Sequence, residues 1–187
     1  LGNPNRFVSP SLLRAPTVAD SLVEATGGES RIVSLSMKAR SAALSVGKKA
    51  TAVVFYDTVA KGMTTSTYYS PRRQLPEWLR EFNKANPVEP LLQTWKPEDP
   101  VRWERHFGAD ARPGEMYPEF PHDPREAEDP FQAFVGTPES SEYLLAAAYA
   151  VVKAERMGLD AVPDLLVLGV SGTDIVGHVW GARSWEY

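Results

Sequence analysis

An acid and an imidazole stand four residues apart near the carboxyl end of the chain, at Asp174 and His178. A carboxylate oxygen and a neutral imidazole nitrogen are both common zinc ligands, and this spacing places them on one side of a helical turn. The same spacing also fits a helix-capping Asp followed by a solvated histidine. Because zinc usually takes about four ligands, the pair by itself predicts only part of a metal site.

Two cations stand two residues apart in the first quarter of the chain, at Lys38 and Arg40. Lysine carries a compact charge and arginine a planar fork, so together they are suited to hold a phosphoryl group and to stabilise charge in its transfer. The alternative is that both are solvated residues near the start of a helix that continues through Ala42 and Leu44.

Each of these pairs follows a run that is typical of a β-strand. Residues 31–36 are β-prone, and residues 164–170 are apolar without polar alternation, so the second run predicts a parallel strand buried on both faces. In open α/β sheets, ligands bind beyond the carboxyl ends of the strands. We therefore expect both pairs to lie at that kind of sheet edge.

The remaining pattern predicts helices and strands in alternation. Thr17 with Asp20 three residues on is typical of a capping box, and Gly27 and Gly28 should end the helix that it opens. The sequence also predicts strands at 31–36 and 52–57 with a helix at 39–46 between them, and a further, optionally antiparallel, strand at 63–69. Two more helices are predicted, one opened by Pro76 and one from Thr137 to about Met157.

Residues 86–136 mix prolines, aromatics and charges without a sustained period. A segment this long inside a compact domain is usually a functional insertion or a lid. We expect Trp95, Trp103 and Phe107 to anchor it by packing, with substrate stacking as the alternative. The histidines His106 and His122 are expected to be surface or hydrogen-bonded side chains.

Composition limits the classes of function. With 187 residues and 43% hydrophobic content, the chain is long enough for a core, and its formal charge of −4 gives no support to nucleic-acid binding. The chain has no cysteine, which excludes disulfides and thiolate chemistry from these residues. It also has no apolar run long enough to predict a membrane span.

The residues around the acid and the imidazole carry a longer pattern. From Ser171 to Glu186 the sequence reads Ser-Gly-Thr-Asp-x-x-Gly-His-x-x-Gly-x-x-Ser-x-Glu. This resembles a metal-binding motif of the alkaline phosphatase superfamily, in particular its type I phosphodiesterase/nucleotide pyrophosphatase branch and the related monoesterase alkaline phosphatases. The resemblance implies that Asp174 and His178 bind one of two catalytic zinc ions.

The first part of the chain resembles the same branch. Ser-x-Lys-x-Arg-x-Ala at Ser36 to Ala42 is followed by Thr-Ser-Thr-Tyr-Tyr at 65–69 and by Leu-Pro-x-Trp-x-x-x-Phe-Asn at 75–83. The resemblance implies that Lys38 and Arg40 are catalytic and substrate-binding residues that contact the transferred phosphoryl oxygens. Members that act on diesters generally lack this pair, which favours a phosphate monoesterase. The alternatives are a phosphodiesterase or nucleotide pyrophosphatase, and a non-catalytic binding module that retains the fold.

The resemblance also implies an α/β fold: a partial alkaline-phosphatase-like fold, with a mostly parallel sheet flanked by helices and an irregular insertion at 86–136. Residues 1–187 would be an internal fragment of a single catalytic domain. The Thr or Ser nucleophile and the other zinc ligands would lie outside it, so we expect an incomplete zinc site and an inactive isolated chain. A phosphate ester is the expected substrate, self-association through exposed sheet edges is expected, and a periplasmic or secreted location is implied.

Overall fold

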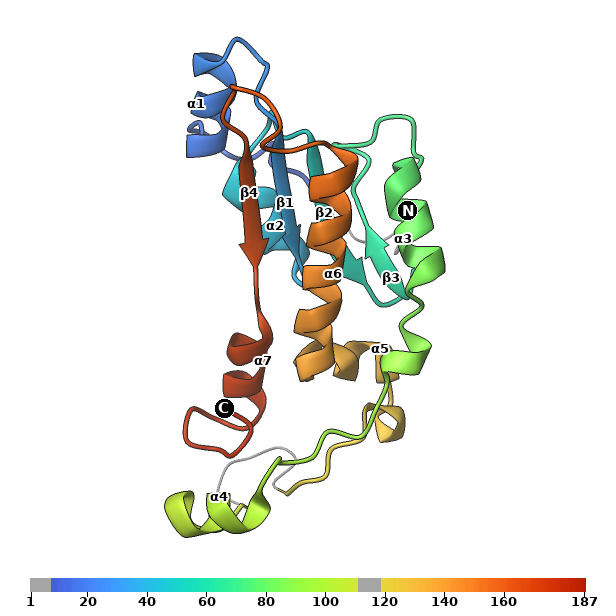
Figure 1. Cartoon of the computed structure of the whole chain (residues 1–187), viewed down its shortest axis with the longest axis vertical. Coiled ribbons are helices and arrows are strands. Elements are labelled where there is room, and N and C mark those ends of the chain that lie inside the picture. Colours follow the sequence, from blue (N-terminus) through green and yellow to red (C-terminus); the bar gives the residue numbers. More distant parts are fainter. Residues whose placement is uncertain (1–7, 111–118) are drawn as a thin grey trace. The chain divides into compact units, whose positions relative to one another are not determined.

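The structure is a computed structural model, which describes residues 8–110 and 119–187 (Figure 1). The chain divides into two compact units. Residues 1–87 and 143–170 form the first, which we call the sheet unit, and residues 88–142 and 171–187 form the second, which we call the aromatic unit. Among the described residues, no helix is long and apolar enough to cross a membrane.

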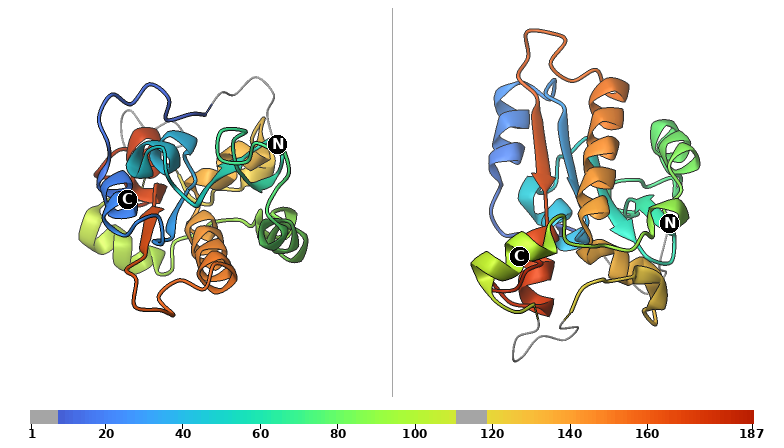
Figure 2. Two further views of the ribbon diagram at one scale, coloured as in Figure 1. Left: turned by 90° about the horizontal axis from the view of Figure 1, so that it is seen from above. Right: turned by 60° about the horizontal axis from the view of Figure 1, so that its bottom comes forward.

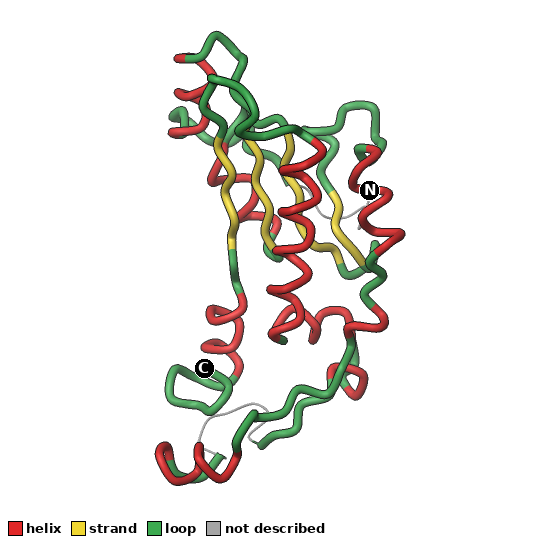
Figure 3. Tube along the Cα trace, viewed as in Figure 1, coloured by secondary structure: helices red, strands yellow, loops and turns green. Residues whose placement is uncertain are grey.

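The sheet unit contains four strands in the order β3-β2-β1-β4, drawn side by side in Figure 3. Strand β1 (Ile32–Ser36) runs parallel to β2 (Ala52–Asp57) and to β4 (Leu165–Gly169). Strand β3 (Gly62–Thr64) is antiparallel to β2, as the antiparallel option predicted, but it is three residues long and ends before the aromatic pair at 68–69. The predicted α/β class with a mostly parallel sheet is confirmed.

Helices cover both faces of this sheet. Phe55 packs in a core cluster with residues of α1 (Val18–Ala25) and α2 (Ala39–Val46). The next side chain, Tyr56, points to the other face because side chains alternate along a strand, and its ring meets Tyr143 of α6 (Pro138–Ala154) edge-on at 6.4 Å. Figure 2 shows the strands between α2 and α6 when the molecule is seen from above.

Helix α3 (Glu77–Ala85) completes the second face through Phe82, whose ring centroid lies 5.2 Å from that of Tyr143. At the end of the same helix, Asn83 forms two hydrogen bonds with Met63 of β3. Its Nδ2 group donates to the carbonyl of Met63 at 2.8 Å, and the Met63 N–H donates to Asn83 Oδ1 at 3.1 Å. The short edge strand is therefore held by a side chain as well as by its neighbour β2.

The expectation that residues 164–170 are buried on both faces is wrong. All five residues of β4 are half-buried, and Val170 after it is 56% exposed. Strand β4 lies at the edge of the sheet that the described residues form, so it has a strand neighbour on only one side. An apolar run indicates that a strand can be buried, but how far it is buried depends on which elements surround it.

The aromatic unit is built mostly from short elements. These are η1 (Glu89–Leu91), α4 (Pro100–Phe107), η2 (Pro124–Glu126), α5 (Pro130–Ala133), η3 (Phe134–Gly136), the beginning of α6, and α7 (Gly172–Val179). Asp99, Asp123 and Asp129 each accept a backbone N–H at the start of one of them. Such caps let short helices form where no long apolar face is available.

Aromatic rings provide the packing of this unit. Trp95 meets Phe120 at 5.1 Å and Trp180 at 5.9 Å, and Trp103 meets Trp185 at 6.0 Å, all in edge-on geometry. The two tryptophans are thus anchors by packing, as expected. Phe107 was expected to do the same, but its side chain is 61% exposed.

Candidate phosphate and metal sites

The backbone that carries Lys38 is fixed by a buried serine at the end of β1. The Lys38 N–H donates to Ser36 Oγ at 3.1 Å, and Ser36 Oγ donates to the carbonyl of Gly169 at 2.9 Å. Ser36 is completely buried, whereas Lys38 is half-buried and Arg40 is exposed. The cationic side chains therefore leave a rigid strand end and can reach solvent.

Both cations lie at the amino end of α2. Lys38 is the N-cap residue in an extended conformation, Arg40 lies in the first turn, and that turn contains no acidic residue. The amino end of a helix carries a partial positive charge, which repels the two cations, as they repel each other. A bound anion would relieve this repulsion. The local arrangement is electrostatically suited to a phosphate group.

The Thr65–Tyr69 segment supports this helix from its other end. The Tyr69 hydroxyl donates to the carbonyl of Gly47 at 2.7 Å, just after the last residue of α2, and burial raises the pKa of this phenol. Thr65 Oγ1 donates to the carbonyl of Val53 in β2 at 2.6 Å. The motif that resembled a family signature is thus a structural brace for the helix that presents Lys38 and Arg40.

The ends of β1 and β4 approach each other closely. Ser36 is in register with Gly169, and a Cβ atom added to Gly169 would lie 2.7 Å from Ser36 Oγ and 2.9 Å from Ser36 Cβ. Only glycine therefore allows the observed distance between the strand ends. Each run was expected to be a strand that one of the pairs follows in the sequence; β1 and β4 are such strands, and they run parallel to each other.

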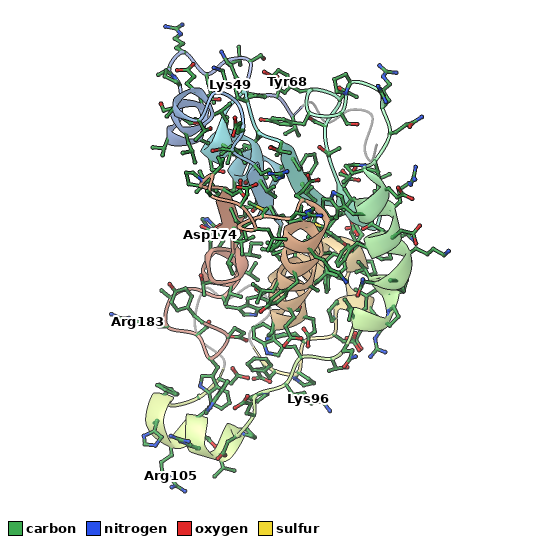
Figure 4. All side chains as sticks on the ribbon, turned by 45° about the horizontal axis from the view of Figure 1, so that its top comes forward. Lys49, Tyr68, Lys96, Arg105, Asp174 and Arg183 are labelled. Carbon is green, nitrogen blue, oxygen red and sulfur yellow. The ribbon has the colours of Figure 1, made fainter. Side chains whose placement is uncertain are left out.

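Asp174 and His178 lie one helical turn apart on α7, and Figure 4 labels Asp174. The His178 Nε2 atom is 3.6 Å from Asp174 Oδ1, and the two side chains are 81% and 55% exposed. The opposite side of the helix carries the buried Val176. The structure thus brings the predicted pair together on the solvent-facing side of α7.

The geometry of this pair fits two positions of a zinc site. With metal–ligand bonds of ~2.0–2.2 Å, two ligand atoms of a tetrahedral site are roughly 3.4 Å apart. The observed 3.6 Å needs little adjustment, and both atom types are ordinary zinc donors. Among residues 8–110 and 119–187, however, there is no group of three or more His, Cys, Asp or Glu side chains that could hold a metal ion. The pair can supply part of a coordination shell.

The two candidate pairs belong to different units. Lys38 and Arg40 are residues of the sheet unit, and Asp174 and His178 are residues of the aromatic unit. Within its own unit, each pair offers a different chemistry: the cations can attract an anion, and the acid and the imidazole can donate to a metal ion.

A third polar pair was not predicted. His122 Nε2 lies 2.6 Å from Glu186 Oε1, and the Glu186 side chain is fully buried while that of His122 is 12% exposed. Sequence reasoning expected a surface or hydrogen-bonded histidine at 122 without naming its partner. The available signal was Glu186, the last residue of the pattern that contains Asp174 and His178.

A hydrogen-bonded turn lies beside this pair. Asp123 accepts from the side chain of Arg125 and from Thr94 Oγ1, the latter at 3.0 Å. The hydrogen bond from Arg125 is the main cause that holds the pKa of the Asp123 carboxyl well below its usual range. The Asp123 carboxylate is therefore charged and hydrogen-bonded, and we assign it the structural role of capping η2.

Comparison with known proteins gives consistent results. The chain is 32% identical over 188 residues to the alkaline phosphatase PhoV of Synechococcus elongatus, which covers 96% of this chain and 34% of that protein. It is 31% identical over 194 residues to the alkaline phosphatase PafA of Elizabethkingia meningoseptica, with 95% and 34% covered. No protein-family model matches.

The fold agrees with these similarities. The crystal structure of wild-type alkaline phosphatase PafA superposes with a TM-score of 0.85 at 30% identity, over 95% of this chain and 36% of that one. The chain therefore has the fold of the corresponding part of that enzyme, and it spans about a third of the length of the relatives that it matches.

Proposed function

We propose that this chain is part of a zinc-dependent phosphatase of the alkaline phosphatase family that hydrolyses phosphate monoesters. The observation that carries the proposal is the placement of Lys38 and Arg40 at the amino end of α2, on a strand end fixed by Ser36. Similarity to two alkaline phosphatases over nearly the whole chain supports it.

In this proposal the two cations bind the phosphoryl oxygens. Lys38 contributes a point charge, and Arg40 can donate two parallel hydrogen bonds to two oxygens of the group being transferred. Both interactions strengthen as negative charge builds on these oxygens in the transition state. The Thr or Ser that accepts the phosphoryl group would be supplied by residues outside this chain.

Asp174 and His178 would hold one of two zinc ions through Oδ1 and Nε2. When bound, zinc supplies Lewis-acid stabilisation of charged oxygens and lowers the pKa of coordinated water. The Asp174 Oδ1 and His178 Nε2 atoms lie 3.6 Å apart on the same side of α7, so one ion can contact both. The remaining ligands would come from outside this chain, so by itself it would be inactive and would bind zinc weakly.

Two further parts of the proposal concern the setting of the enzyme. The half-buried edge strand β4 presents backbone groups that another strand can pair with, which favours self-association of the isolated chain. A periplasmic or secreted location is included because the resemblance implies it.

The alternative within the enzymes is a phosphodiesterase or nucleotide pyrophosphatase. A phosphate monoester has three non-bridging oxygens for a Lys/Arg pair to contact, whereas a diester has two and carries a second ester group. The pair therefore favours monoesters. A non-catalytic binding module would leave both the Lys38/Arg40 pair and the Asp174/His178 pair without a role.

The test is a comparison of Lys38→Ala and Arg40→Ala with Lys48→Ala in the protein expressed from its complete gene. Lys48 is an exposed cation beyond the other end of α2, so it controls for a change in charge. We expect each of the first two changes to reduce kcat/KM for a phosphate monoester by about 100-fold, and Lys48→Ala to leave it unchanged.

The same variants are assayed on a phosphate diester. Loss confined to the monoester supports the monoesterase. Equal loss on both substrates, with the diester as the better substrate of the unmodified protein, favours the alternative. Normal monoester turnover in both Lys38→Ala and Arg40→Ala would contradict the proposed role of the pair.

A further inference from the structure

The segment that follows α7 folds back onto the helix. Ser184 Oγ donates to the carbonyl of Gly181 at 3.0 Å and accepts from the Tyr187 N–H at 3.3 Å, which closes a tight loop. The ring of Tyr187 lies against Gly177, where an added Cβ atom would be 3.2 Å from Tyr187 Cε2. The loop therefore packs on the helical turn that contains His178.

Glu186 fastens this loop to a distant part of the chain. Its side chain is fully buried, and Oε1 lies within hydrogen-bond distance of His122 Nε2, at 2.6 Å, 64 residues away in sequence. A carboxylate oxygen and an imidazole nitrogen at this distance share one hydrogen bond. Glu186 Oε2 is buried as well and has no hydrogen-bond partner within the described ranges, so the bond to His122 is the one that compensates burial of this carboxylate.

His122 also contacts the last turn of α7 directly. Its ring centroid lies 4.8 Å from that of Trp180, which is the C-cap residue of the helix. Phe120 flanks the imidazole at 4.6 Å and Trp95 at 5.9 Å. The imidazole thus touches both the end of the helix and, through Glu186, the loop behind it.

The backbone of His122 is itself fixed. Its N–H donates to the carbonyl of Trp95 at 3.0 Å, and the Trp95 N–H donates to the carbonyl of His122 at 2.8 Å. This isolated β-bridge joins the two segments of residues 88–142 on which the histidine and the tryptophan lie. Because both its backbone and its ring are held, His122 can restrict the movement of the residues that it contacts, Trp180 and Glu186.

From these contacts we infer that His122 and Glu186 are a positioning pair that holds the last turn of α7, and with it His178, in place for metal binding. The inference rests on the proposed function for its purpose, but the contacts themselves lie within the aromatic unit. Groups that orient a metal ligand from behind typically change metal affinity by about 10- to 100-fold when they are removed.

The decisive comparison is between His122→Asn and His122→Gln in the protein expressed from its complete gene. A glutamine amide reaches roughly the position of Nε2 and can donate to Glu186, whereas an asparagine amide stops near the position of Nδ1. The two variants therefore share their chemistry and differ in whether the bond to Glu186 forms. His106→Ala, which removes an exposed histidine of α4 in the same unit, is the control.

Two measurements read the result. Hydrogen exchange in the metal-free protein is expected to become at least tenfold faster at the amides of residues 176–180 in His122→Asn, and to stay near normal in His122→Gln and His106→Ala. Titration with Co²⁺, followed by its visible spectrum, is expected to show about 10- to 100-fold weaker binding in His122→Asn and recovery in His122→Gln.

The inference is overturned if α7 exchanges at the same rate in all variants, or if the Asn and Gln variants behave alike. Should His122→Asn not fold, Glu186→Gln is measured in its place, because it keeps the size of the side chain and removes the charge; unchanged exchange and Co²⁺ affinity there count against the inference. If the unmodified protein binds no Co²⁺ and hydrolyses no ester, the proposed function fails, and exchange in α7 alone decides the role of the pair.

Discussion

At the scale of single residues, the polar side chains of this chain divide by what surrounds them. The side chains of Arg40, Asp174 and His178 are exposed, and that of Lys38 is half-buried. Asp20 is the contrasting case, because it is 4% exposed and its carboxylate accepts hydrogen bonds from Thr17 and from the backbone of Lys48 and Lys49. The candidate sites consist of charged side chains that reach solvent, whereas a buried carboxylate that accepts several hydrogen bonds from the protein has a structural role.

Asp20 connects the start of α1 with the end of α2. Its Oδ2 accepts from the Thr17 N–H at 2.9 Å, and its Oδ1 accepts from the N–H groups of Lys48 and Lys49 at 2.9 and 3.0 Å. Burial raises the pKa of this carboxyl, but the hydrogen bonds from Thr17, Lys48 and Lys49 together outweigh burial and leave the pKa lowered. Its ionised form therefore stabilises the sheet unit.

We expect Asp20→Asn to lower the free energy of unfolding by about 2 kcal/mol at neutral pH, since an amide would direct N–H groups at backbone donors. A group with a lowered folded-state pKa stabilises above its unfolded pKa of about 3.9 and loses this contribution as pH falls through the folded value. The difference between the two proteins, measured by urea unfolding, should thus shrink below about pH 4. Asp160→Asn, at a 48% exposed side chain, is the control; equal losses would contradict the assignment.

At the scale of elements, the site depends on how closely two strand ends meet. The contact between Gly169 and Ser36 fixes the end of β4 beside the end of β1, and Ser36 in turn accepts from the Lys38 N–H. A change at the edge strand should therefore be felt at the start of α2.

Gly169→Ala is expected to destabilise the protein by about 1–3 kcal/mol, because the added methyl group would lie under 3.0 Å from both Oγ and Cβ of Ser36. The loss should be smaller in a Ser36→Gly background, where both of these atoms are absent. A double-mutant cycle on the free energy of unfolding measures this coupling. Additive effects of the two changes would show that the strand ends do not limit each other.

The elements themselves could be read from sequence to different degrees. The capping box of Thr17 and Asp20 is present in full, and the predicted helix at 39–46 coincides with α2. These features depend on residues close in sequence. The burial of β4 depends on which elements surround the strand. The bond between His122 and Glu186 joins residues that are 64 positions apart. A local sequence pattern encodes neither kind of contact.

At the scale of the whole molecule, the metal-binding proposal and the length of the chain point the same way. Asp174 and His178 fill two of about four zinc positions, and residues 8–110 and 119–187 contain no larger group of metal-binding side chains. The relatives are about three times as long as the part of them that is matched. The proposed activity therefore needs metal ligands beyond those that the described residues supply.

The 187-residue chain expressed alone is accordingly expected to show no zinc-dependent monoester hydrolysis, while the product of the complete gene does. In the proposed function the nucleophile and the other metal ligands lie outside this chain, and phosphate contacts from Lys38 and Arg40 alone would not replace them. Sedimentation velocity of the same sample should show concentration-dependent association through β4, which is an edge strand of the sheet that the described residues form. Zinc-dependent turnover by the isolated chain that Asp174→Ala abolishes would show instead that these residues hold a complete site.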